Sequence, residues 1–179
     1  MMVKTMGDSH GWSDQDKDSK ALLCMLGLGA GEILGALVFG RIADKLENKK
    51  TIMINMLTST VAYVFLILYA SIYDFSYYMA ILMTFTWGVQ DAGINTYLNA
   101  LLGFQFASKT TPFSVFKFLQ SFLIFCVDEL VTTTDNQLSY ICFFGATYVV
   151  AMAAWIVLSA FFDRKSEKEV EKMRKDRMA

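Results

Sequence analysis

The chain has 179 residues, with 16 lysines and arginines against 17 aspartates and glutamates, and 55% of its residues are hydrophobic. Length alone would allow one soluble domain, but this apolar content, a single proline and a positive mean hydropathy do not suit a soluble fold. A net charge near zero, without a basic and aromatic surface pattern, gives no reason to expect a nucleic-acid partner.

The residues that usually carry chemistry are few. Cys24, Cys126 and Cys142 all lie inside apolar segments and are predicted to be small packed thiols, since their scatter fits neither a disulfide framework nor a zinc site. The single histidine, His10, has no neighbouring ligands. We therefore expect no metal and no cofactor. No nucleophile, base and orienting group occur together, so no catalytic residues are assigned and the chain is not expected to be an enzyme.

Five apolar segments follow a polar N-terminal tail over residues 1–20, which contains acidic residues and no apolar core of a signal peptide. Each segment is long enough to cross about 30 Å of hydrocarbon as a helix, in which every backbone amide finds an internal partner. We predict an all-α, multi-pass membrane protein in the lipid bilayer, with a transmembrane domain over 21–163 and a charged cytoplasmic tail over 164–179. The tail is interpreted as a solvated helical extension, with a lipid-binding segment as the alternative. The expected spans are 21–40, 51–73, 77–103, 112–133 and 138–162.

The first span carries one ionisable residue, Glu32, among glycines that recur every four residues. Gly27, Gly31 and Gly35 leave one helix face almost bare, which allows another helix to approach closely. An ionisable residue inside a span is costly and marks a functional candidate. Glu32 is accordingly either a candidate cavity residue or part of a packing face that turns toward polar neighbours.

A short charged segment separates the first two spans. Between residues 41 and 50 it holds Arg41, Lys45, Lys49 and Lys50, whereas the apolar runs on either side are almost free of charge. A short basic loop between membrane-length segments indicates a cytoplasmic hairpin.

The third span contains a row of residues at four-residue intervals, which forms a slowly drifting stripe on one side of a helix. Polar atoms there must face protein or water, so the stripe predicts either an aqueous cavity or a buried hydrogen-bond network. Both interpretations stay open. The row comprises Trp87, Asp91, Asn95, Asn99 and Gly103.

The fourth span begins near Pro112, which suits a first helical turn, and carries Lys117 followed by Gln120. Lys117 lies less than two turns inside the span, where its side chain can snorkel to the surface. The alternative is an ion pair between Asp91 and Lys117 on adjacent helices.

The basic residues favour one orientation of the chain. They concentrate in the 41–50 loop, at Lys109 in the 104–111 loop and in the tail, whereas the alternating loops hold only acids such as Asp74 and Asp135. With five crossings, all the basic loops fall on one side of the membrane. The positive-inside rule then predicts an N-terminus outside or in a lumen and a cytoplasmic C-terminus.

The charged segment between the first two spans resembles the signature loop of the major facilitator superfamily. Glu47 replaces the usual second glycine of that loop, and Asn48 replaces the usual arginine. Four residues match the signature: Gly40, Asp44, Lys45 and Lys49.

Three further stretches resemble the Unc-ninety-three-like branch of that superfamily: residues 29–35, 87–104 and 113–121. The resemblance covers residues 21–163, and the order of the stretches is similar to spans eight to twelve of a twelve-span protein. It implies most of a C-terminal half of a transporter. Because a facilitator binds its solute between two halves, such a chain is expected to need another membrane protein or a second copy.

Three functions follow from the resemblance. The first is a truncated solute transporter that works with a partner on a small solute; the Asp91 stripe would then line the cavity, and Asp44 with Lys45 would latch the cytoplasmic side. The second is a non-transporting structural, regulatory or trafficking subunit of a larger membrane complex, since the branch includes such members. The third is a truncated product without an independent role.

Overall fold

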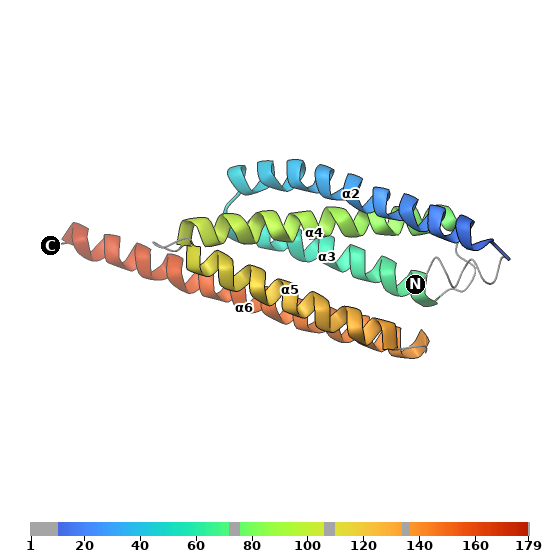
Figure 1. Cartoon of the computed structure of the whole chain (residues 1–179). Helices are drawn as coiled ribbons and strands as arrows, with labels where there is room; N and C mark the ends of the chain where they lie inside the picture. The colour runs from blue at the N-terminus through green and yellow to red at the C-terminus, as the bar shows by residue number, and fades with distance from the viewer. Residues whose placement is uncertain (1–10, 72–75, 106–109, 134–136, 179) are drawn as a thin grey trace.

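The apolar segments form helices. The computed structural model describes residues 11–71, 76–105, 110–133 and 137–178, and in these ranges it contains five α-helices and no strand. Figure 1 shows them lying lengthwise in one elongated bundle. The prediction of an all-α, multi-pass membrane protein is confirmed. The helices are α2 (Asp14–Lys45), α3 (Asn48–Ser71), α4 (Tyr77–Gln105), α5 (Thr110–Thr133) and α6 (Gln137–Met178).

Four helices are long and apolar enough to cross a membrane by length and composition: α2, α3, α5 and α6. Helix α4 falls outside this group, although a span was predicted there. Its second half carries amide and carboxyl side chains, including Gln90, Asp91 and Asn95. It also contacts α2, α3 and α5, so it occupies the centre of the bundle. Other helices therefore cover much of the polar surface of α4.

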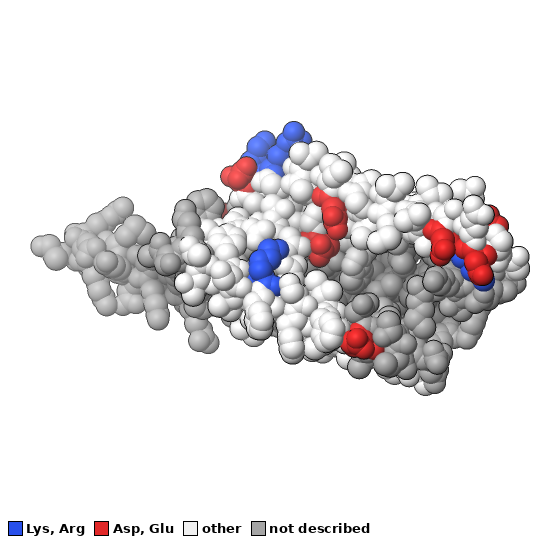
Figure 2. Space-filling model, viewed as in Figure 1, with Lys and Arg blue, Asp and Glu red and all other residues white. Residues whose placement is uncertain are grey.

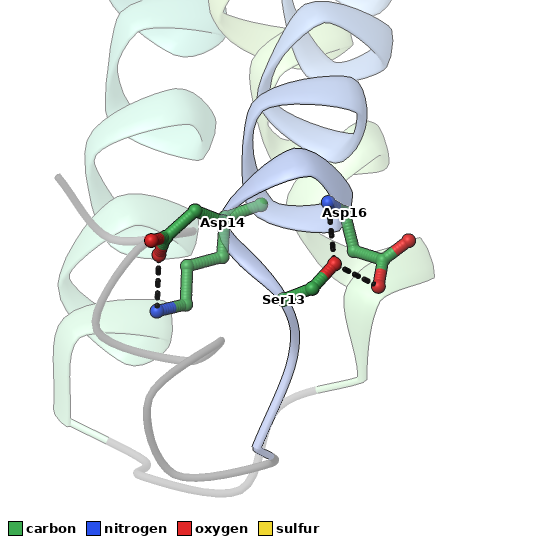
Figure 3. A network of polar contacts seen from close by, with 4 residues as sticks. Ser13, Asp14 and Asp16 are labelled. Carbon is green, nitrogen blue, oxygen red and sulfur yellow. Dashed lines mark hydrogen bonds and ion pairs between the residues drawn. The ribbon is translucent and has the colours of Figure 1, made fainter.

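Helix α2 begins at Asp14, seven residues before the expected start of the first span. Ser13 explains this extension, because its Oγ accepts a hydrogen bond from the Asp16 backbone nitrogen at 3.2 Å and so caps the helix (Figure 3). Asp14 accepts a hydrogen bond from Lys17 at 3.2 Å in the same turn. Acidic residues in the first turn also favour the positive end of the helix dipole.

The charged segment between the first two spans is mostly helical rather than a loop. Helix α2 continues to Lys45 and α3 begins at Asn48, so only Leu46 and Glu47 connect them. The basic residues at its two ends therefore lie on helix surfaces. The segments that contain Asp74, Lys109 and Asp135 lie outside the described residues.

Helix α6 runs for 42 residues without a break. At about 1.5 Å per residue it is about 63 Å long, roughly twice the hydrocarbon thickness. Its apolar part covers residues Ile141–Ala160, and the remainder continues as helix to Met178. Figure 1 shows this end extending past the other helices. The backbone of the tail is thus helical, whereas the tail's side chains lie outside the described residues.

The closest packing in the bundle joins α2 to α4. A methyl group at Gly31 would overlap the backbone of Phe85, and one at Gly35 would lie 2.7 Å from the Val89 carbonyl oxygen. Gly88 makes the corresponding close contact from α4, since a methyl group there would overlap the Leu28 carbonyl oxygen. Successive glycines of α2 meet successively later residues of α4, so the two helices run parallel. The predicted bare glycine face is confirmed, and α4 is its partner.

The remaining helices are held less tightly. Helix α3 packs against both α4 and α6, where Ile52, Tyr97 and Trp155 form a buried cluster. The Tyr97 and Trp155 rings lie 5.9 Å apart. Helix α5 touches α4 at few positions, and none of its described side chains is buried. Figure 1 shows α5 along the lower edge of the bundle.

Candidate functional site

A continuous chain of hydrogen bonds links α4 to α5. Asn95 Nδ2 donates to the Asp91 side-chain oxygen at 3.1 Å and to the Asp91 backbone carbonyl at 3.0 Å. Gln120 Nε2 of α5 donates to Asn95 Oδ1 at 3.2 Å. Lys117 Nζ then donates to Gln120 Oε1 at 2.9 Å. We call Asp91, Asn95, Gln120 and Lys117 the polar chain.

The polar chain replaces the direct ion pair between Asp91 and Lys117 that the sequence suggested. No ion pair joins these two side chains; two amides lie between the carboxylate and the ammonium group. Each amide donates toward the carboxylate and accepts from the ammonium side, so the dipoles are aligned from Lys117 to Asp91. The ammonium group also lies 5.2 Å from the Phe116 ring. Snorkelling of Lys117 stays a prediction.

Glu32 is not part of the polar chain. Its side chain is exposed in the middle of α2 and has no hydrogen-bond or ion-pair partner among the described residues. Its backbone nitrogen lies at the α2–α4 contact, 3.0 Å from where a methyl group at Gly88 would be. Because Asp91 follows Gly88 by about one helical turn, Glu32 and Asp91 occur at a similar height in the bundle. Figure 2 shows acidic groups at mid-length of the visible face and a basic group nearby.

Asn99 is the other candidate that stands apart. Its side-chain oxygen is buried and has no hydrogen-bond partner. A helix advances by 3.6 residues per turn, so a stripe with four-residue spacing rotates by about 40° at each step. Asn95 reaches Gln120 of α5, whereas Asn99 is rotated by about 40° from Asn95 around α4 and its side-chain oxygen makes no such bond. Trp87, one step before Asp91, packs against Tyr63 of α3 with ring centroids 5.2 Å apart.

The four signature residues lie together at the junction of α2 and α3. Asp44 and Lys45 end α2 and Lys49 belongs to the first turn of α3, and all three are exposed. Asp44 and Lys45 have no ion-pair partner within the described chain. A methyl group at Gly40 would meet nothing within 4 Å. No contact with the described residues therefore explains why this position is glycine.

A second polar row, on α3, was not found from the sequence. Thr51, Asn55 and Ser59 are each at most 1% exposed. Gln90 Nε2 of α4 donates to Ser59 Oγ at 3.3 Å, and Asn55 Nδ2 donates to the Thr51 carbonyl at 3.0 Å. Their four-residue spacing was the available signal, but uncharged polar residues attract little notice in a span. The row continues the polar interior of the bundle from α4 into α3.

Among the described residues, no group of three or more histidine, cysteine, aspartate or glutamate side chains is placed to hold a metal ion. The polar chain contains no histidine, cysteine or serine beside a base. It can bind polar groups and hold charge within the membrane, and this is the chemistry that the arrangement offers.

Comparison with known families gives one match. Residues 1–127 match the profile of the Major Facilitator Superfamily, so the match covers 127 of the 179 residues. The chain belongs to the Major Facilitator Superfamily. The comparisons with curated proteins and with solved structures return no match.

Membership of the Major Facilitator Superfamily confirms the coarser part of the sequence resemblance. The matched region contains the signature residues, Glu32 and the whole polar chain, whereas α6 lies beyond it. This facilitator chain is therefore a transporter-like, integral, multi-pass membrane protein. Members of the superfamily are typically transporters rather than enzymes.

Proposed function

We propose that this chain is a solute-transport module of the Major Facilitator Superfamily and that the α2–α4–α5 face lines the solute route. The polar chain is the observation that carries the proposal. It places a carboxylate, two amides and an ammonium group on two mainly apolar helices. Ionisable groups at this depth are retained at a cost, and they mark substrate or ion pathways.

The charges of this face support a role in binding a polar solute. Asp91 and Lys117 are separated by amides rather than paired, and Glu32 has no partner among the described residues. A lipid surface offers nothing to these groups, whereas a water-filled route or a polar solute satisfies them. The amides of Asn95 and Gln120 add donors and acceptors that can orient such a solute.

We further propose that a second membrane chain, or a second copy of this one, completes the route. Facilitators bind solute between helical repeats and move one repeat against the other. Here Lys117 is exposed and none of the described side chains of α5 is buried, while α4 is the helix that α5 contacts most among the described residues. A partner against this face would enclose the polar groups and exclude lipid from them.

Branch and orientation belong to the same proposal. The stretches 29–35, 87–104 and 113–121 favour the Unc-ninety-three-like branch and a position equivalent to spans eight to twelve. The α2–α3 junction and the C-terminal end of α6 lie at the same end of the bundle in Figure 1. This supports a cytoplasmic location for that end, because the basic residues of the sequence concentrate there.

Uptake measurements test the proposal. The chain is purified with any membrane protein that co-purifies, reconstituted into vesicles and supplied with labelled cationic, zwitterionic and anionic solutes. We expect uptake of at least one class and a loss of about tenfold or more in Asp91→Asn, which keeps the size of the side chain and removes its charge. Val150→Ala, on the exposed apolar surface of α6, serves as the control. A discrete complex without uptake of any class contradicts transport and favours a non-transporting subunit.

A further inference from the structure

A patch of cations marks the end of the bundle where α2 passes into α3. Arg41 and Lys45 lie on the last turns of α2, and Lys49 and Lys50 lie on the first turn of α3. We call these four residues the basic patch. All four side chains are exposed. Figure 2 shows basic groups gathered at this end of the molecule, with an acidic group beside them.

The cations of α2 are not neutralised within the described chain. Arg41 and Lys45 are one turn apart, so they share a face of the helix, and neither forms an ion pair or a hydrogen bond there. Lys50 has a partner, since its Nζ lies 3.4 Å from Glu47 Oε2, but both side chains of this pair are more than half exposed. An exposed pair of this kind is weak. By sequence, residues 41–50 carry four cations against the two carboxylates of Asp44 and Glu47, and Lys49 makes a further interaction of its own.

The position of the basic patch places it at the level of lipid headgroups. The apolar part of α2 ends at Phe39, which is 3% exposed, and that of α3 begins at Ile52, which is fully buried. The cations between them lie just outside the two apolar segments. Leu46, in the two-residue connection, is 37% exposed among these charges. An exposed apolar side chain between charged residues, Lys45 and Glu47, suits the surface of a bilayer.

We propose that the basic patch binds the phosphate headgroups of anionic phospholipids in the adjoining leaflet. Arg41 and Lys45 supply the attraction from α2, Lys49 and Lys50 supply it from α3, and Leu46 lies toward the acyl chains. Juxtamembrane groups of four or more cations recognise anionic lipids in this way. A role limited to setting orientation during insertion also requires positive charge. That role predicts no preference for one phospholipid in the folded protein.

Lipid titration of the full chain in detergent tests the proposal, with native mass spectrometry to count bound phosphatidylglycerol and phosphatidylcholine. We expect preferential retention of phosphatidylglycerol. Removing one cation by Arg41→Gln or Lys45→Gln weakens phosphatidylglycerol binding by about fivefold. Asp44→Asn strengthens phosphatidylglycerol binding, because a carboxylate that repels the headgroup is lost. Lys17→Gln, which removes a lysine at the opposite end of α2 that is paired with Asp14, is the control for charge loss outside the patch and leaves binding unchanged.

Three results would overturn the proposal. Equal retention of the two lipids removes the role of charge, and an equal effect of Lys17→Gln removes the role of this patch. Competition by inorganic phosphate at the same concentration as the lipid assigns the site to soluble phosphate instead. The gain expected for Asp44→Asn keeps the test decisive if the glutamine variants fail to fold.

Discussion

Single glycines decide how closely α2 approaches α4. Gly31 lies against the Phe85 backbone, where a side chain has no room, whereas a methyl group at Gly29 would meet nothing within 4 Å. The four-residue spacing of the glycines predicted a packing face from sequence alone. The spacing could not predict which helix covers it, because that depends on how the chain returns through the bundle. Close backbone approach of this kind is a main source of helix association in lipid.

We predict that Gly31→Ala destabilises the chain and that Gly29→Ala does not. The new methyl group at position 31 forces the two backbones apart, at a cost of about 1–3 kcal/mol, as in other overpacked contacts. At position 29 the same change removes only the flexibility of glycine, which stabilises a helix by about 0.5–1 kcal/mol. Unfolding in detergent micelles, followed by circular dichroism, gives the two free energies. Equal stability of the two variants would contradict the close contact.

The helices themselves were easier to predict than their ends and partners. The apolar segments indicated all five helices, but α2 starts earlier because Ser13 caps it, and the charged junction keeps helical backbone up to Lys45. Within the candidate site, the spacing of Asp91 and Asn95 predicted their shared face. Their connection to Gln120 depends on the packing of α4 against α5, which is tertiary. The buried row of Asn55 and Ser59 was missed for a different reason, because its uncharged side chains do not stand out in a span although their spacing was visible.

Helix α5 offers the clearest test at the scale of an element. Its few contacts with α4 include the bond from Gln120 to Asn95, so Gln120→Leu removes a main attachment. Hydrogen bonds between membrane helices contribute about 0.6 kcal/mol on average, so we expect about threefold faster hydrogen exchange in α5 peptides. Exchange in α2 peptides stays unchanged. Ser121→Ala, the adjacent exposed position, is the control, and the same acceleration in that variant would argue against the bond.

The whole molecule combines a tightly packed pair with loosely attached helices. Helices α2 and α4 interlock through glycines, α3 joins α4 to α6, and none of the described side chains of α5 is buried. Exposed apolar residues such as Phe118 and Leu123 suit lipid. Glu32 and Lys117 are also exposed, and charged side chains do not suit lipid. We call the surface that carries Glu32 and Lys117 the charged side of the bundle. Unlike the rest of the exposed surface, it requires protein or water against it.

This difference leads to a prediction about assembly. If a partner or a second copy covers the charged side, the protein in mild detergent has a mass above that of the 20.2 kDa chain, measured by light scattering with the detergent subtracted. Glu32→Leu and Lys117→Leu should weaken that assembly by about 30-fold or more, because each leaves a polar group of the partner unpaired at a cost of about 2 kcal/mol or more. Val150→Ala alters only lipid-exposed surface and should leave the mass unchanged. A single-chain mass for the wild type at all concentrations would show that water, rather than protein, lies against Glu32 and Lys117.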